Sequence, residues 1–164
     1  MLLRRRESPG VEVVAIEGDE GKLPREATLN TAAVAAAAFL EQQGLSFGLE
    51  LSLFKGMPMS SGLGSSAASA VAAVYAANLL AGSPCTATEL LPFTMRAEAV
   101  ACGAAHADNV APALLGGFVL IRSYEPLDVV RLPVPAGLAA ATVHPHTEIQ
   151  TSDARRILKK EIRL

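Results

Sequence analysis

Apolar and polar positions alternate or cluster along the chain in patterns that predict a series of short elements. Residues 11–16 and 47–53 have the alternation of half-buried strands, and the second is more typical of an antiparallel sheet than of a doubly wound parallel one. An alanine-rich run predicts a helix that a cap at Thr28 or Asn30 opens and that ends after Gln43, at Gly44. Further helices are expected over 65–80, over 108–115 and from about Thr151. Another should begin at a Thr86–Glu89 capping box and run to about 101, with a bend near Pro92. Further strands are expected over 118–122, 128–132 and 138–143. Without an internal repeat or linker, this order predicts one α+β layered domain.

The composition is that of a folded intracellular domain and excludes several classes of function. A chain of 164 residues with 51% hydrophobic and 18% charged residues can bury a core and lies outside the range of disordered proteins. Its 14 Lys and Arg against 16 Asp and Glu give a formal charge of −2, which argues against the basic face of a nucleic-acid-binding protein. No uninterrupted apolar run predicts a membrane span, and no apolar segment of a signal peptide follows Arg4–Arg6. We therefore expect a cytoplasmic protein with no nucleic-acid or membrane partner, in which Cys85 and Cys102 are reduced thiols.

The most informative segment is the glycine- and serine-rich loop over 58–69, between an expected strand and an expected helix. Glycines let the backbone approach a ligand closely, and the first turn of a helix offers unpaired N–H groups at the positive end of its dipole. Serine hydroxyls add hydrogen-bond donors or a metal ligand. Together these features predict a phosphate-binding loop over Gly62–Ser66. The plainer alternative is that Ser65 or Ser66 only caps the helix, although four serines within seven positions exceed the need for one cap.

Two common types of phosphate loop fit this segment poorly. It is not a Walker A loop, because no Gly-Lys-Ser/Thr follows the glycines. Gly62, Gly64 and Ala67 match the dinucleotide fingerprint G-x-G-x-x-A, but that turn should leave a buried strand almost at once, whereas residues 54–61 intervene here. Glu89, the acid about 20 residues further on, is expected at a helix start and not at a strand end. Dinucleotide binding stays an alternative at this point.

A second group of polar residues lies in an otherwise apolar stretch and comprises Glu98, His106, Asp108 and Asn109. Phosphoryl transfer needs charge neutralisation around the γ-phosphate, so a carboxylate that holds Mg²⁺ is the natural partner of the serine loop. Taken singly, Glu98 can also be a surface carboxylate, His106 a structural histidine, and Asp108 and Asn109 the caps of a short helix. A metal site at His106-x-Asp108 lacks a third ligand at convincing spacing.

The residues in these two groups resemble those of a known family. The motif Pro58-x-x-x-Gly62-Leu63-Gly64-Ser65-Ser66-Ala67-Ala68 resembles the nucleotide-binding motif of the GHMP kinases, and the run from Glu98 to Gly117 resembles the homoserine kinases among them. The resemblance implies that Ser66 and Glu98 hold Mg²⁺, that Glu98 is catalytic, and that a pocket for L-homoserine is lined by His106, Asp108 and Asn109. The residues that it implies for ATP binding are Pro58, Ser60, Ser61, Gly62, Leu63, Gly64, Ser65, Ser66 and Ala67.

A third segment, over 148–156, is also similar to the homoserine kinases. By that resemblance Thr151 is catalytic and lies near the transferred phosphate, while Arg155 binds the substrate carboxylate. A guanidinium fork is chemically suited to a carboxylate. Without the family context, the same residues would indicate a Thr/Ser-capped helix with a solvated basic face.

The resemblance also implies an activity and an architecture. The activity is ATP-dependent phosphorylation of the side-chain hydroxyl of L-homoserine, a step of threonine biosynthesis that uses Mg²⁺. The architecture is an N-terminal, ATP-binding domain over 1–150 with a ribosomal-protein-S5 domain 2-like fold. Residues 151–164 would begin a C-terminal, ferredoxin-like domain that is mostly absent.

Residues 1–10 contain nothing like the first strand and the Asn/Asp motif of the family, so we expect a chain truncated at both ends. Loss of the first strand would expose a sheet edge, through which a homodimer could form. Two alternatives to the activity are a non-catalytic nucleotide-binding fragment and a GHMP kinase with a different small-molecule substrate.

Overall fold

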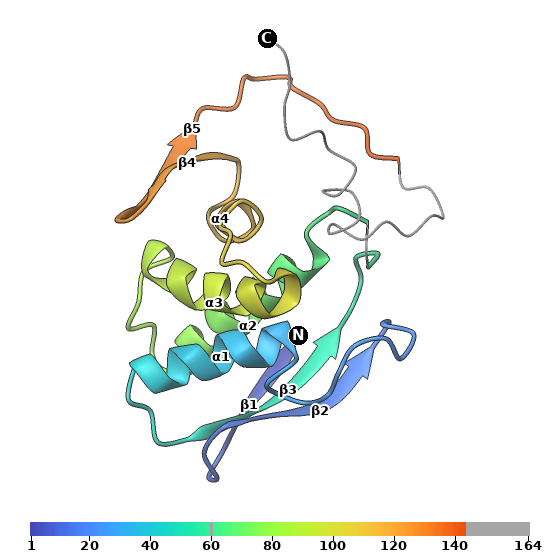
Figure 1. Cartoon of the computed structure of the whole chain (residues 1–164), viewed down its shortest axis with the longest axis vertical. Helices are drawn as coiled ribbons and strands as arrows, with labels where there is room; N and C mark the ends of the chain where they lie inside the picture. The colour runs from blue at the N-terminus through green and yellow to red at the C-terminus, as the bar shows by residue number, and fades with distance from the viewer. Residues whose placement is uncertain (60, 144–164) are drawn as a thin grey trace.

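The computed structural model of the chain describes residues 1–59 and 61–143 and is organised around a three-stranded sheet (Figure 1). The strands are β1 (Leu2–Arg6), β2 (Val11–Glu17) and β3 (Gly48–Phe54), in the order β1-β3-β2. β3 is antiparallel to β1 and parallel to β2, so the expected antiparallel pairing holds for one of its two neighbours. The parallel pair requires a crossover connection, which helix α1 (Thr31–Gln42) supplies.

The chain has a strand at its N-terminus, β1, where the residue pattern indicated none. β1 pairs with residues 48–52 along its whole length, and Leu3 is buried opposite Leu51. The alternation of apolar and polar residues does not predict this strand, because Arg5 stands two positions after Leu3, where an apolar residue is expected. Its guanidinium lies 4.3 Å from the centroid of the Phe47 ring and donates to the carbonyl of Leu80. β3 is paired on both sides, while β1 and β2 form the two edges of this sheet, so the homodimer stays a prediction.

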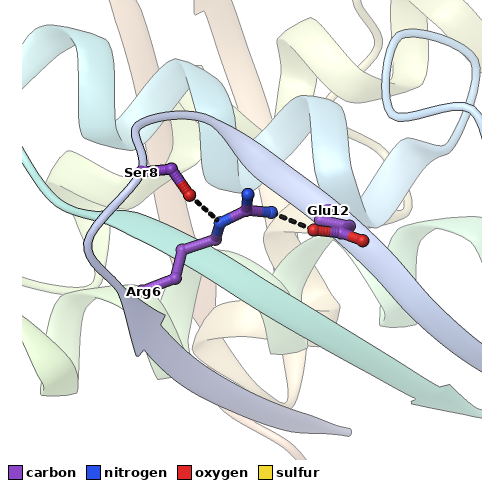
Figure 2. Close-up of polar contacts among 3 residues, drawn as sticks. All are labelled: Arg6, Ser8 and Glu12. Atoms are coloured by element: carbon purple, nitrogen blue, oxygen red, sulfur yellow. Dashed lines mark hydrogen bonds and ion pairs between the residues drawn. The ribbon is translucent and has the colours of Figure 1, made fainter.

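The connection between β1 and β2 passes across the start of β3. Figure 2 shows Arg6 donating to the Ser8 hydroxyl over 2.8 Å and forming an ion pair with Glu12 of β2. A Cβ on Gly48 would lie 2.1 Å from the carbonyl oxygen of Ser8 and 2.6 Å from that of Gly10. The connection can approach β3 this closely only because position 48 carries no side chain.

We expect Gly48→Ala to lower the free energy of unfolding by about 2–3 kcal/mol, because both crowded atoms belong to the backbone and cannot rotate away. The measurement is urea denaturation followed by circular dichroism. Gly56→Ala is the control, since a Cβ there would meet nothing within 4 Å. Equal unfolding midpoints for the two variants would contradict this account of the crossing.

Helices α1 and α2 (Ser65–Leu80) lie on one face of the sheet, and α3 (Leu91–Cys102) packs against these two helices (Figure 1). Asn30 caps α1 by accepting from the amides of Ala32 and Ala33 at 3.1 and 3.3 Å. Small side chains let the helices and the sheet approach closely, and larger residues such as Phe39 and Leu51 fill the space between them. Within the described residues, no helix is long and apolar enough to cross a membrane.

The predicted capping box before α3 is confirmed. The Glu89 carboxylate accepts from the Thr86 amide at 2.8 Å, and the Thr86 hydroxyl accepts from the Glu89 amide at 3.4 Å. A 3₁₀ turn, η1 (Thr88–Leu90), follows, and α3 begins with Pro92 in its first turn. Pro92 does not require a bend at this place, because a proline in the first turn leaves no intrahelical hydrogen bond unmade.

Beyond the helices lie α4 (Val110–Leu115) and a hairpin of β4 (Phe118–Tyr124) and β5 (Leu127–Leu132) (Figure 1). One face of the hairpin packs on the cluster that contains α4. The strand expected over 138–143 does not form. Residues 133–143 are exposed and outside any strand, and Pro133 and Pro135 remove two backbone donors before this segment. The helix expected from Thr151 lies outside the described residues.

Candidate phosphate-binding site

The glycine- and serine-rich loop joins the end of β3 to the start of α2. Gly64 occupies the N-cap position of α2 with φ of 75°, a left-handed conformation that glycine adopts at little cost. Ser65 and Ser66 are the first residues of the helix and not its cap, and Gly64 supplies no capping side chain. The interpretation of the two serines as simple helix caps is therefore wrong. The first turn keeps backbone N–H groups available for another acceptor.

The described serines of the loop have different environments. The Ser61 hydroxyl donates to the carbonyl of Pro58 at 2.8 Å and accepts from the amide of Leu63 at 3.3 Å, so it holds a turn within the loop. The Ser65 hydroxyl is turned to the carbonyl of Met57, 3.4 Å away. Ser66 lies close enough to Glu98 for its hydroxyl to lower the pKa of that carboxyl group. The structure thus places Ser66 beside an acid, whereas Ser60 lies outside the described residues.

Glu98 lies in the middle of α3 with only 4% of its surface exposed. The alternative of a surface carboxylate is therefore wrong. Burial is the largest influence on the pKa of Glu98 and raises it. The charge of Asp108 raises this pKa further, whereas Ser66 and His106 lower it. Ser66 comes from α2 and His106 and Asp108 from the segment after α3, and all three act on the Glu98 carboxyl group.

Residues 106–109 lie between the end of α3 and the start of α4. His106 is half-buried, while Asp108 and Asn109 are exposed. Asp108 accepts from the amide of Asn109 at 3.1 Å. Asn109 stands at the N-cap of α4, but its side chain makes no capping bond there. Instead its Oδ1 lies 3.4 Å from the place that a Cβ on Gly64 would take, so Asn109 lies against the glycine loop.

A small apolar cluster brings the loop and residues 106–109 together. Ala67 in the first turn of α2 is fully buried against Ala107 and Ala111 in this cluster, and Val110 belongs to it as well. Alanine and valine side chains allow two helix starts to approach closely. Tertiary packing, rather than local sequence, therefore joins the two motifs into one site.

Sequence reasoning missed Lys55, which follows the end of β3. Its ammonium donates to the carbonyl oxygen of Ser65 at 2.7 Å and to the hydroxyl of Ser69 at 2.8 Å. Burial lowers the pKa of Lys55. One signal in the sequence points to it: Lys55 is the only basic residue between Arg25 and Arg96, and it directly precedes the loop.

The chemistry of the site favours phosphate and a hard cation. A Cβ on Gly62 would meet nothing within 4 Å, so the loop is open there. The Ser66 hydroxyl and the Glu98 carboxylate are oxygen donors of the kind that Mg²⁺ prefers. Among the described side chains, no three His, Cys, Asp or Glu residues gather as a metal cage. Two protein oxygens of this kind are the usual protein share for Mg²⁺, which otherwise binds phosphate and water.

The dinucleotide alternative does not fit this geometry. Glu89 is engaged with Thr86 in the capping box, and residues 55–61 separate β3 from the glycines. Thr151 and Arg155, the two further residues predicted for the site, lie outside the part of the chain that the structure describes.

Comparison with known proteins identifies the family. The family described as GHMP kinases N terminal domain matches residues 30–117. The chain is 51% identical over 166 residues to a homoserine kinase of Chloroherpeton thalassium, covering 96% of this chain and 51% of the relative. It is 43% identical over 159 residues to one of Xylella fastidiosa, covering 97% of this chain and 48% of the relative.

Solved structures agree with this. A crystal structure of homoserine kinase from Cytophaga hutchinsonii matches with a TM-score of 0.90 and 53% identity, over 99% of this chain and 51% of that one. A mevalonate kinase, with a TM-score of 0.55 and 17% identity over 71% of this chain and 42% of its own, shares the fold alone. The chain spans about half the length of the curated relatives that it matches. It belongs to the GHMP kinase family, and its described residues have the α+β fold of that family's N-terminal domain.

Proposed function

We propose that this chain is the nucleotide-binding part of a kinase that transfers the γ-phosphoryl group of ATP to the side-chain hydroxyl of L-homoserine. The products are ADP and O-phospho-L-homoserine, the intermediate that threonine biosynthesis uses. The observation that carries the proposal is the contact of Ser66 with buried Glu98 beside the first turn of α2, in a chain about half identical to homoserine kinases.

The glycine loop and the start of α2 are the proposed site of the ATP phosphates. Residues 62–66 present backbone to a ligand, and the N-terminal end of α2 carries partial positive charge. In phosphoryl transfer most of the rate comes from positioning and from neutralising charge on the phosphates. A loop that leads into a helix start with available amides can supply both.

Ser66 and Glu98 are the residues that would hold Mg²⁺. Their oxygen atoms fit that ion, and the Glu98 carboxyl must be ionised to bind it. When bound, Mg²⁺ neutralises charge on the β- and γ-phosphate oxygens. Glu98 is buried with a raised pKa, so an ion beside it would favour the charged form that burial disfavours.

Residues 106–109 would form one wall of the homoserine pocket. The Asp108 carboxylate is suited to the ammonium group of an amino acid, and Asn109 and His106 offer groups that bind a carboxylate or hydroxyl. We propose Arg155 as the partner of the substrate carboxylate and Thr151 as a group near the transferred phosphate. We also propose that the ATP-binding domain ends near residue 150 and that residues 151–164 begin a second domain.

The proposal is tested by coupled measurement of ADP release with L-homoserine, together with calorimetric titration of the chain with Mg-ATP. We expect Mg-ATP binding and release of ADP that depends on homoserine. Release with mevalonate or a sugar in place of homoserine would contradict the substrate. Mg-ATP binding without turnover on any of these substrates would instead support a non-catalytic nucleotide-binding fragment.

A further inference from the structure

We infer that Lys55 is a positioning residue for the phosphate-binding loop, whose ammonium fixes the first peptide group of α2 and so aims the amide of Ser66 at the nucleotide. This inference rests on the proposed function for its ligand. Lys55 belongs neither to the glycine and serine motif nor to the acidic group, and it reaches the loop only through tertiary structure.

The Lys55 ammonium, the Ser65 carbonyl and the Ser69 hydroxyl are all hydrogen-bonded to one another at the start of α2. The Nζ of Lys55 lies 2.7 Å from the carbonyl oxygen of Ser65 and 2.8 Å from the Ser69 hydroxyl, which itself lies 3.1 Å from the same carbonyl. Ser65 and Ser69 stand one helical turn apart on α2. The ammonium therefore ties the end of β3 to the first turn of the helix.

The backbone of Lys55 is held from the other side by the end of β2. Its amide donates to the carbonyl of Glu17 at 2.8 Å. A Cβ on Gly18 would lie 2.4 Å from the carbonyl oxygen of Lys55, so the two backbones are in close contact there. The ammonium is thus carried by a fixed point of the sheet, which suits a residue that positions another segment.

The geometry of one peptide group explains how the contact acts on the ligand. The carbonyl of Ser65 and the N–H of Ser66 belong to the same planar trans peptide, so they point in opposite directions. A strong bond that holds the oxygen toward Lys55 therefore directs the N–H away from Lys55, toward the N-terminal end of α2. An ammonium on the oxygen also polarises the peptide and strengthens its N–H as a donor.

The charge of Lys55 is poorly placed for a purely structural tie. A cation near a helix N-terminus is at the unfavourable end of the dipole, and half-burial of an ammonium is also unfavourable. A neutral side chain would join the strand and helix with less electrostatic opposition. An anionic phosphate at the loop reverses the balance, because the ammonium and the helix end then attract the same group.

The test compares Lys55→Met, Lys55→Arg and a charge-matched control, Lys22→Met, whose lysine is exposed and paired with Glu20. The first measurement is the ¹⁵N–¹H shift of the Ser65–Ala67 amides in the ligand-free chain. The second is the Kd for Mg-ATP and for adenosine, which lacks phosphates. For Lys55→Met we expect a displaced Ser66 amide resonance, Mg-ATP binding weakened roughly tenfold, and adenosine binding unchanged. Lys55→Arg should recover most of the Mg-ATP affinity, and Lys22→Met should change neither measurement.

The outcomes separate this inference from the proposed function. An unmoved Ser66 amide in folded Lys55→Met would overturn the positioning role whether or not ATP binds. Equal losses for Mg-ATP and adenosine would reduce Lys55 to a stabilising residue and overturn it as well. Failure of the wild-type chain to bind Mg-ATP would overturn the proposed function, while the amide shifts still decide whether Lys55 orients the peptide. If Lys55→Met does not fold, Ser69→Ala removes one of the two ammonium bonds. Ser69→Ala should weaken Mg-ATP binding by less than tenfold and leave adenosine binding unchanged. Wild-type affinity for Mg-ATP in this variant would overturn the inference.

Discussion

Glu98→Gln is expected to make the ligand-free chain more stable at neutral pH while removing its response to Mg²⁺. The substitution keeps the shape of the side chain and an oxygen that can accept from Ser66, but it removes a charge that is buried and lies near Asp108. Stability and function therefore oppose each other at this position. Addition of Mg²⁺ should tighten ATP binding by the wild-type chain but not by the variant. Any homoserine-dependent turnover should fall by about a hundredfold.

The direction of the pH dependence follows from the pKa of Glu98. Because burial first, and Asp108 further, raise this pKa above its ordinary value of 4.5, the folded chain binds the proton more tightly than the unfolded chain. The protonated Glu98 carboxyl therefore contributes to the free energy of unfolding. This contribution is complete below pH 4.5 and is lost as the pH rises through the higher pKa of the folded state. Wild-type stability should therefore fall over that window relative to Glu98→Gln, and the two proteins should converge near pH 4.

Urea denaturation at a series of pH values measures this effect. Glu41→Gln is the control, because it removes the same charge from an exposed residue that pairs with Arg96. Its stability should change by less than about 1 kcal/mol at every pH. The account of Glu98 would be contradicted if Glu98→Gln were less stable than wild type at neutral pH, or if it still responded to Mg²⁺.

Gly64→Ala is expected to weaken Mg-ATP binding by about tenfold or more, with a smaller loss of stability. The residue has φ of 75°, where an alanine is strained by about 1–2 kcal/mol. Its new Cβ would also lie 3.4 Å from Asn109 Oδ1, at the short limit of ordinary van der Waals contact. The chain can relieve both effects by shifting the first turn of α2, which moves the amides proposed to bind phosphate.

Two further variants make this experiment specific. Gly82→Ala places the same strain at φ of 87°, just after α2 and with open space around the new Cβ. It should lower the melting temperature about as much as Gly64→Ala without weakening Mg-ATP binding. Adding Asn109→Ala to Gly64→Ala removes the crowded side chain. The double variant should be less destabilised than the sum of the two single variants. Strict additivity would contradict a contact between the loop and Asn109.

The elements that were predicted well are those in which a local rule and the tertiary structure agree. α1 and α2 are alanine-rich, and Asn30 and the Thr86–Glu89 pair cap their helices as their positions indicate. The failures have tertiary causes. Arg5 occupies an inward position of β1 because Phe47 and Leu80 receive its guanidinium, which no alternation rule can foresee. Residues 138–143 have the composition of a strand but find no partner strand among the described residues.

The sequence by itself predicted the type of chemistry, because glycines and serines before a helix, followed by an acid and a His-x-Asp-Asn segment, favour a phosphate site through local backbone and side-chain properties. It also determined the family, since the order of those motifs is specific. Only the tertiary structure decided which serine meets the acid, that Glu98 is buried, and that Asn109 and Lys55 reach the loop. These relations join residues 10 to 45 positions apart, and they depend on how helices and strands pack, which no local pattern in the chain records.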